Sequence, residues 1–281
     1  MRTACARMSG DVGSVPTLRM VRLSMLMLKK LLLALCLGGS ACAAAAAVEV
    51  AAPPAAVTPA VTRMVRQAIA SLSSKAEVDS IEPAPLPGFY QVIASGQLLY
   101  ISADGKYLLH GDLLDLSRRQ NLSDAAWARY RKVELAKVPA AERIVYAPAH
   151  PKYTVTVFTD VNCGFCRALH DHMAAFNRAG IAVEYLAWPR EGVTTTAGRP
   201  TPTYTEMVSV WCAADRRAAF EQATAGHAPK PATCVNPVKH EFDLGLKLGV
   251  TGTPTIFAAD GRSLGGYMTP EQLLQALQKG S

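Results

Sequence analysis

Two cysteines three residues apart, Cys163 and Cys166, are the side chains whose types and spacing most clearly suit chemistry. Gly164 and Phe165 separate them, and the residues that follow favour a helix. The first turn of a helix presents unpaired backbone N–H groups and a positive dipole, which lower the pKa of a thiol placed there. We therefore expect Cys163 to be a nucleophilic thiolate. Cys166, one turn further in, should be more buried and should resolve a mixed disulfide formed on Cys163.

Three other uses of the Cys163–Cys166 pair fit the sequence less well. A structural zinc site needs two further ligands in a matching arrangement, which Cys212 and Cys234 do not offer. Covalent haem needs a histidine directly after the second cysteine, where this chain has Arg167. A purely structural disulfide within four residues would be strained, which favours a redox role. We therefore predict no metal and no other cofactor.

A proline dipeptide, Thr253-Pro254, follows about 90 residues after the cysteines at the start of a predicted strand. An ordinary trans proline that opens a strand is one interpretation. The other is a cis peptide whose backbone edge lies beside the redox helix. We predict the cis form, packed across from Cys163 and offering backbone hydrogen bonds to an extended substrate.

The net charge of +7 is concentrated at the N-terminus. Residues 1–47 contain six basic side chains and one acidic one, which gives +5 and leaves +2 for the rest. If this segment is removed, the charge gives no reason to expect a nucleic-acid partner or an anionic membrane surface. The basic residues are Arg2, Arg7, Arg19, Arg22, Lys29 and Lys30, and the acidic one is Asp11.

The same segment has the pattern of a secretory signal. Lys29-Lys30 precedes the apolar run from Leu31 to Leu37, and small residues follow up to the alanine tract at 43–47. A membrane anchor or lipidation of Cys42 are the alternatives. We predict an upstream extension and signal peptide over 1–47, and hence export.

Removal of this segment would leave an even number of cysteines, because Cys5, Cys36 and Cys42 would be lost with it. An even number in an exported chain favours disulfide chemistry. The four that remain are Cys163, Cys166, Cys212 and Cys234.

The amino-terminal half of the remaining chain is expected to form a small domain. Residues 48–60 form an Ala/Pro-rich tail, 61–122 a domain, and 123–146 a connecting helix capped by Ser123. A core of about 60 residues is marginal, so association with a second copy would complete it. Its expected elements are a helix over Val61–Leu72 and strands over Phe89–Ala94, Gln97–Ala103 and Lys106–Leu114.

Residues 147–281 follow the order of a thioredoxin fold, with a helical insertion at about 190–248. A strand, helix, strand half precedes the insertion, and a hairpin with a last helix follows it, which makes the chain α+β. The expected elements are strands Tyr153–Thr159 and Ile181–Ala187, a helix over 163–179, strands Pro254–Ala258 and Ser263–Tyr267, and a helix opened by Thr269-Pro270. The insertion should hold three helices: Tyr204–Ala214, one begun by Asp215 and one begun by Asn236-Pro237.

Several short motifs surround the cysteine pair and occur through the rest of the chain. They are Phe158-Thr159-Asp160 before the cysteine pair, Tyr185 to Arg190, Trp211-Cys212-Ala213, Gly249 to Pro254, and, in the amino-terminal part, Ile81 to Pro85, Gly105-Lys106 and Gly111-Asp112. Together these motifs resemble the DsbC/DsbG family of periplasmic protein disulfide isomerases. The likeness runs from about Val61 to the C-terminus.

The resemblance implies a V-shaped homodimer joined through small cystatin-like amino-terminal domains. It implies two redox sites facing a cleft that binds misfolded disulfide-containing exported proteins in a chaperone-like way. It further implies that Cys163 and Cys166 are kept reduced by a membrane DsbD-type reductase, that Cys212 and Cys234 form a structural disulfide, and that Gly164, Phe165, Thr253 and Pro254 support the active site.

The chain departs from the expected pattern in three places. Residues 192–202 form a longer and less acidic connection, Phe165 replaces a tyrosine, and Val157 stands where thioredoxin buries a carboxylate. A net disulfide reductase or oxidase of the same fold is the alternative function. A holdase chaperone that binds unfolded chains without redox turnover is another.

Overall fold

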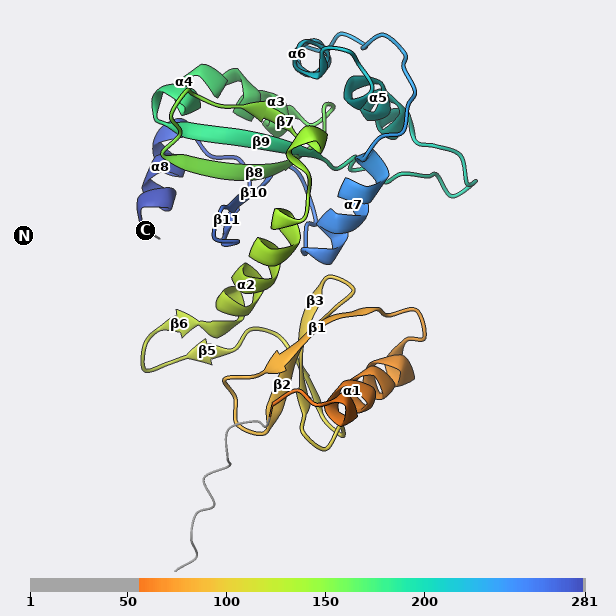
Figure 1. Ribbon diagram of the computed structural model, residues 1–281, viewed down its shortest axis with the longest axis vertical. Coiled ribbons are helices and arrows are strands. Elements are labelled where there is room, and N and C mark those ends of the chain that lie inside the picture. The colour runs from red at the N-terminus through yellow and green to blue at the C-terminus, as the bar shows by residue number, and fades with distance from the viewer. Residues whose placement is uncertain (1–55, 280–281) are drawn as a thin grey trace, which may run out of the picture. The chain divides into compact units, whose positions relative to one another are not determined.

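The computed structural model describes residues 56–279 (Figure 1). The predicted signal peptide over 1–47 and the start of the Ala/Pro-rich tail lie outside the described residues. Within 56–279, no helix is long and apolar enough to cross a membrane.

The amino-terminal part is one helix on a four-stranded antiparallel sheet of order β1-β2-β3-β4. Three strands were expected from the sequence, and β1 is the additional one. It was missed because its residues are largely polar and it ends in a proline, a combination that only an edge strand tolerates. The elements are α1 (Pro59–Leu72), β1 (Val78–Pro83), β2 (Phe89–Ala94), β3 (Gln97–Ser102) and β4 (Leu108–His110).

The last of these strands is shorter than expected. The predicted strand over Lys106–Leu114 is only β4, and a separate small hairpin of β5 (Leu114–Asp115) and β6 (Gln120–Asn121) follows. Gly111, with a φ of 139°, separates the two. Strand β4 is therefore a short outer strand whose second edge is unpaired within the described part of the chain.

The two faces of this sheet bury different neighbours. Val65 and Ile69 of α1 pack on one face against a cluster that includes Val92 and Ile101. On the other face Tyr100 belongs to a cluster that also contains residues of α2 (Leu122–Ala136). The alternation of buried side chains along β2 and β3 thus covers both faces.

Helix α2 starts slightly earlier than predicted. Asn121, rather than Ser123, is the N-cap, and its Oδ1 accepts the N–H of Ser123. The Ser123 hydroxyl is buried instead, 2.7 Å from the Tyr100 hydroxyl. A short 3-10 helix, Ala140–Glu142, follows α2.

The carboxy-terminal part is built on a five-stranded sheet of order β11-β10-β8-β9-β7. Strands β8 and β9 are parallel and the other pairs are antiparallel. Ile144–Tyr146, which the sequence suggested to be part of the connecting segment, forms β7 at the edge of this sheet beside β9. The strands are β7 (Ile144–Tyr146), β8 (Tyr153–Thr159), β9 (Ile181–Ala187), β10 (Thr255–Ala258) and β11 (Ser263–Gly265).

The helix predicted over 163–179 is two helices. The chain leaves helical geometry at His172, so α3 and α4 are separate (Figure 1). The three predicted insertion helices and the last helix are present, the last with a capping box between Thr269 and Gln272. The bounds are α3 (Gly164–Asp171), α4 (Met173–Arg178), α5 (Pro202–Trp211), α6 (Arg216–Thr224), α7 (Val238–Lys247) and α8 (Pro270–Gln278).

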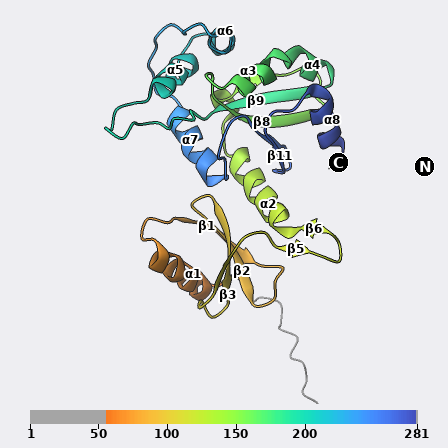
Figure 2. The ribbon, with the colours of Figure 1, turned by 180° about the vertical axis from the view of Figure 1, so that it is seen from behind.

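Buried side chains alternate along the central strands, so the sheet has two covered faces. Val157 and Tyr185 point into a cluster with α3, α4, α5, α6 and α8. Phe158, Leu186 and Phe257 belong to a second cluster with α2 and α7. Both views show α3 and α4 lying along β8 and β9 (Figures 1 and 2). The start of α3 is thereby held at the carboxyl end of β8.

Candidate active site

Cys163 lies at the N-terminus of α3. It is the N-cap residue, with extended backbone angles, and its carbonyl accepts the N–H of Arg167 to start the helix. Its own N–H donates to the carbonyl of Asp160, directly after β8. The backbone thus turns sharply from the strand into the helix and places the sulfur of Cys163 at the helix start.

A buried carboxylate organises this turn. Asp160 is 1% exposed, and its Oδ1 accepts the N–H of Asn162 at 2.7 Å. Its Oδ2 accepts the backbone N–H of Arg190 at 2.8 Å and pairs with the Arg190 Nε at 3.4 Å. Arg190 also donates from Nη2 to the carbonyl of Asn162, next to Cys163. Sequence reasoning assigned no role to Asp160 or Arg190, although both stand in the motifs that carry the family resemblance.

The Thr253–Pro254 peptide bond is cis, as predicted. The Sγ of Cys163 donates to the carbonyl oxygen of Thr253 at 3.2 Å, so this segment does lie beside the cysteine pair. The carbonyl can accept only from the thiol form. The hydroxyl of Thr253 is buried and close to both sulfurs.

The two thiols differ in acidity. Burial raises the pKa of Cys163, but hydrogen bonds to Thr253 and Cys166 and the charge of Arg190 outweigh it, so the pKa lies below its ordinary value. Burial raises the pKa of Cys166 to about 12, against smaller opposing contributions from Thr159, Asp160 and Thr253. Cys163 is therefore the more acidic thiol of the pair.

Exposure alone would not have distinguished the two sulfurs. Cys163 and Cys166 are both free thiols, and both are 2% exposed, so the expectation that Cys166 is the more buried residue is not met at the level of exposed area. Phe165 between them is 66% exposed, with its ring 6.1 Å from that of Tyr267. The phenylalanine therefore offers an apolar surface next to the reactive sulfur.

Comparison with known proteins identifies the chain. The disulfide bond isomerase N-terminal domain matches residues 39–124, and a thioredoxin-like domain matches residues 140–281. The thiol:disulfide interchange protein DsbC of Escherichia coli K12 is 35% identical over 217 residues, which is 76% of this chain and 86% of that protein. The chain belongs to the DsbC family of thiol:disulfide interchange proteins.

DsbC of a second organism agrees with this assignment. DsbC of Dickeya dadantii is 36% identical over 197 residues, covering 70% of this chain and 79% of that protein. A crystal structure of a disulfide interchange protein from Neisseria gonorrhoeae is similar over 50% of this chain and 97% of that chain, at 26% identity and a TM-score of 0.43. The predicted family, the fold class and the enzyme class are confirmed: this DsbC-family chain is a thiol-disulfide oxidoreductase with disulfide isomerase function.

The other two cysteines of the DsbC-family chain are joined. Cys212, at the end of α5, forms a disulfide with Cys234, with an S–S length of 2.07 Å. This bridge spans the loop around α6 and fastens it to α5. It is the structural disulfide that the family resemblance implies.

The longer connection at 192–202 is a small turn next to the active site. Thr194 bridges Pro200, and the Thr201 hydroxyl donates to the carbonyl of Gly192. Directly after it, α5 carries Glu206, whose carboxylate accepts the side-chain amide of Asn162 at 2.7 Å. The connection at 192–202 is thus linked through α5 to Asn162, the residue that precedes Cys163.

Thioredoxin buries a carboxylate at the position that Val157 occupies here, and Val157 cannot replace its function. Val157 is 1% exposed and belongs to the apolar core. Buried hydroxyl groups near Cys166 are those of Thr159 and Thr253 and the Tyr185 phenol, whose pKa is raised well above its ordinary value, chiefly by burial. None of these three hydroxyl groups is a base at neutral pH.

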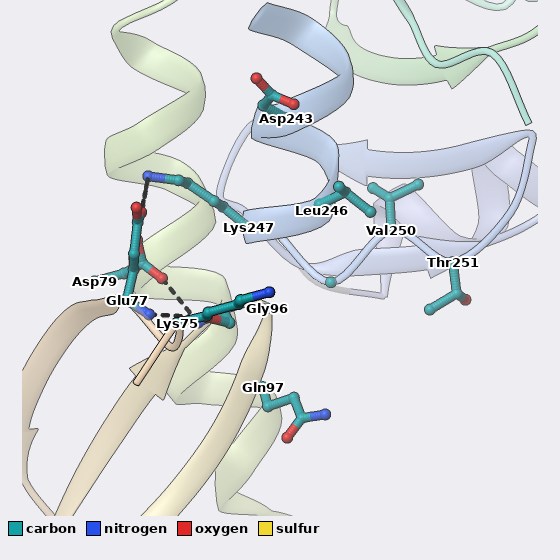
Figure 3. A pocket seen from close by; sticks show the side chains of 12 residues that line it. Lys75, Glu77, Asp79, Gly96, Gln97, Asp243, Leu246, Lys247, Val250 and Thr251 are labelled. Atoms are coloured by element: carbon teal, nitrogen blue, oxygen red, sulfur yellow. Dashed lines mark hydrogen bonds and ion pairs between the residues drawn. The ribbon is translucent and has the colours of Figure 1, made fainter. Parts of the chain in front are cut away.

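A cavity of about 480 Å³ lies away from the cysteines, between the β2–β3 hairpin and the end of α7 (Figure 3). Figure 3 shows Lys247 extending toward Glu77 and Asp79, with which it forms ion pairs of 3.5 Å and 3.4 Å. Gly96 at the hairpin tip packs against the carbonyl of Leu246. These charges are occupied by one another, so we assign no ligand to this cavity. In the described part of the chain, no group of three or more His, Cys, Asp and Glu is placed to hold a metal ion.

Proposed function

We propose that this chain isomerises non-native disulfides in exported proteins, with Cys163 as the nucleophile and Cys166 as the resolving thiol. The observation that carries the proposal is the opposite acidity of the two thiols at the start of α3, beside the backbone of Thr253. Gly164 and Phe165 shape the loop, and Thr253 and Pro254 form the edge beside which an extended substrate would bind.

The reaction begins when the Cys163 thiolate attacks one sulfur of a substrate disulfide. A mixed disulfide forms and the other substrate sulfur leaves as a thiolate. That thiolate, or another in the substrate, then attacks a different disulfide or the mixed disulfide itself. When the last attack releases Cys163, the substrate holds the same number of disulfides in a new pairing, and no net oxidation has occurred.

Cys166 provides the escape from a stalled intermediate. It loses its proton and attacks the Cys163 sulfur, which leaves an oxidised Cys163–Cys166 pair and a reduced substrate. Burial, which raises the pKa of Cys166 in the free enzyme, disfavours its thiolate at neutral pH and so leaves the substrate time to rearrange. The oxidised pair then needs two electrons, which we assign to a membrane DsbD-type reductase.

The association of two copies is supported by the outer strand of the amino-terminal sheet. Leu108 and Leu109 of β4 are 38% and 47% exposed, and Tyr107 before them is 66% exposed. Exposed apolar side chains on an unpaired strand edge are a liability unless another chain covers them. We assign β4 to the homodimer interface, which would bring two active sites to one cleft that binds misfolded chains.

The proposed division of the chain is 48–60 as tail, 61–122 as dimerisation domain, 123–146 as connecting segment and 147–281 as catalytic domain, with the insertion at about 190–248. The proposed compartment is the periplasm. It is supported by the signal-like pattern of residues 1–47 and by the Cys212–Cys234 disulfide, which needs an oxidising environment.

Two substrates distinguish disulfide reduction from disulfide isomerisation. Insulin reduction requires only attack and release, whereas recovery of active ribonuclease from its scrambled form requires repeated rearrangement. We expect Cys163→Ser to abolish both activities and Cys166→Ser to retain part of the ribonuclease recovery while accumulating mixed disulfides. If Cys163→Ser still recovers ribonuclease, the nucleophile is misassigned. If the wild type only prevents aggregation of substrate and Cys163→Ser does so equally, the chain acts as a holdase.

A further inference from the structure

Glu241 of α7 is a buried acid that the exchange reaction described above does not use. Its side chain is fully buried, and its Oε2 accepts the backbone N–H of Ala187 at 2.5 Å. Its Oε1 has no hydrogen-bond partner within the described residues. A buried carboxyl with one unpaired oxygen is costly, so its single bond to Ala187 calls for an explanation.

The hydrogen bond between Glu241 and Ala187 lies where β9 has no neighbouring strand on the side of β7. Strand β7 pairs with β9 only as far as Tyr185, which faces Ile144. Ala187 is the last residue of β9 and lies two positions beyond Tyr185, where the pairing with the first residue of β7 stops. Glu241 therefore supplies the acceptor that a longer β7 would have supplied, and it fixes the end of β9 from the side of α7.

The segment held in this way leads directly to the active site. Trp188 donates its N–H to the carbonyl of Thr159, and its ring lies against Gly245, where an added Cβ would come within 2.4 Å of it. Gly245 is one helical turn after Glu241, so one face of α7 holds both Ala187 and Trp188. Two residues further, Arg190 binds Asp160 beside Cys163.

The two arginines near Glu241 are already engaged elsewhere. Glu142 precedes β7, and Arg143 pairs with Glu184 and donates to the carbonyls of Leu135 and Val138. Arg216 at the start of α6 donates to the carbonyl of Ala141. Burial, and to a smaller extent Glu142, raise the pKa of Glu241 to about 8, while Ala187, Arg143 and Arg216 oppose the rise. The raised pKa favours the neutral carboxyl at pH 7.

We propose that Glu241 is a positioning residue for disulfide exchange, which fixes the end of β9 through Ala187 and thereby the Arg190–Asp160 contact beside Cys163. The proposal rests on Cys163 being the nucleophile. It also predicts that the free energy of unfolding depends on pH through Glu241, because the fold favours the neutral form of this carboxyl.

The sign of this dependence follows from proton binding. In the unfolded chain Glu241 has an ordinary pKa of 4.5, whereas in the fold it is about 8. Between these values the folded form holds the extra proton, so the free energy of unfolding falls as pH rises through the window and levels off above it. Below pH 4.5 both states hold the proton, so this contribution to the free energy of unfolding is fully present and no longer changes with pH. Cys163, whose pKa is lowered, acts in the opposite direction, so Glu241 must be measured as a difference between variants.

Two variants separate the hydrogen bond from the charge. Glu241→Gln keeps a carbonyl acceptor for Ala187 and cannot ionise, whereas Glu241→Leu removes the acceptor. Each is compared with the wild type in the full chain. The measurements are urea unfolding from pH 5 to 9 and the rate of Cys163 alkylation by iodoacetamide at pH 6, with the label located by mass spectrometry.

We expect Glu241→Gln to lose the decline in stability between pH 5 and 8 and to alkylate within about twofold of the wild type. We expect Glu241→Leu to alkylate about threefold more slowly, and no more slowly than a variant that lacks the Arg190 charge, because it acts through Arg190. A wild-type decline that persists in Glu241→Gln, or a folded Glu241→Leu that alkylates at the wild-type rate, overturns the proposal. If Glu241→Leu does not fold, the Glu241→Gln comparison decides. If the label of the wild type falls on another cysteine, the assignment of the nucleophile has failed instead.

Discussion

Single side chains decide which sulfur of the pair reacts. Cys163 and Cys166 have the same small exposed area, and their acidity differs because of what surrounds each sulfur. The cation of Arg190 and the start of α3 favour a thiolate at Cys163, whereas Cys166 lies one turn inside the helix among poorly solvated groups. The difference in acidity is thus set by burial at Cys166 and by polar neighbours at Cys163.

The first prediction concerns this difference in acidity. In the reduced protein, brief treatment with iodoacetamide at mildly acidic pH should label Cys163 far more than Cys166, because only the thiolate reacts. Mass spectrometry of the labelled peptides measures the ratio, and the urea-unfolded protein is the control in which the preference should disappear. A predominant label on Cys166 would contradict the assignment of the nucleophile.

The second prediction concerns Arg190, whose charge lowers the pKa of Cys163. Arg190→Met should raise the pKa of Cys163 and slow its alkylation at pH 6 by about twofold to fivefold, the range of a solvent-screened pair of charges. Arg190→Lys is the matched control, because it keeps the charge but loses the fixed geometry of the guanidinium. The absorbance of the thiolate near 240 nm, followed against pH, measures the shift. Equal titration curves for the wild type and Arg190→Met would rule out the charge effect.

Sequence spacing is sufficient to predict some of the residues at the active site but not others. The cysteine pair and Thr253-Pro254 can be found because their chemistry depends on adjacent or nearly adjacent residues. Asp160 and Arg190 are 30 residues apart, and Glu241 and Ala187 are 54 apart. A glutamate in a helix with an ordinary polar pattern gives no sign of burial, so only the fold brings these partners together.

At the scale of elements, period-two and helical patterns predict most of the architecture because burial enforces them. The short elements are not predicted by these patterns. Strands β1 and β7 were missed, the first because it is a polar edge strand and the second because it has only three residues. The break at His172 was missed because the apolar pattern continues from α3 into α4. Each of these is decided by tertiary pairing rather than by local preference.

The third prediction concerns the contact of the β2–β3 hairpin with α7. Gly96 has a φ of 73°, and an added Cβ would lie 2.1 Å from the carbonyl oxygen of Leu246. Gly96→Ala should therefore lower the free energy of unfolding by about 1 kcal/mol for the left-handed backbone. Separation of the hairpin from α7 should lower it by about 1–3 kcal/mol more. Urea unfolding measures the sum.

Gly88 provides the matched control for this variant. Its φ is 77°, and no atom lies within 4 Å of an added Cβ. Gly88→Ala should therefore lose only the backbone contribution, about 1 kcal/mol. If the two variants lose equal stability, the packing of Gly96 against Leu246 contributes nothing in solution.

At the scale of the whole molecule, the redox chemistry lies in one part of the chain, and the requirement for isomerisation lies in another. Residues 61–122 contain no cysteine, yet they carry the exposed edge of β4. A substrate must stay bound through several rounds of attack, and a cleft between two copies would provide that residence. The central claim is therefore that exchange needs only the catalytic part, whereas isomerisation needs the dimer.

The structure also indicates where the catalytic part should be cut. Helix α2 shares a buried cluster with Phe158, Leu248 and Phe257 of the catalytic part, and β7 belongs to its sheet. A fragment that begins at 145 would lose α2 and expose this cluster to water. A fragment that begins at Leu122 keeps both elements.

The most direct measurement compares this fragment, 122–281, with the chain lacking only residues 1–47, on insulin and on scrambled ribonuclease. Sedimentation gives the state of association of each. We expect the longer chain to be a dimer active on both substrates, and the fragment to be a monomer that reduces insulin at a similar rate but recovers little ribonuclease. A monomeric fragment that recovers ribonuclease as well as the longer chain would contradict the account.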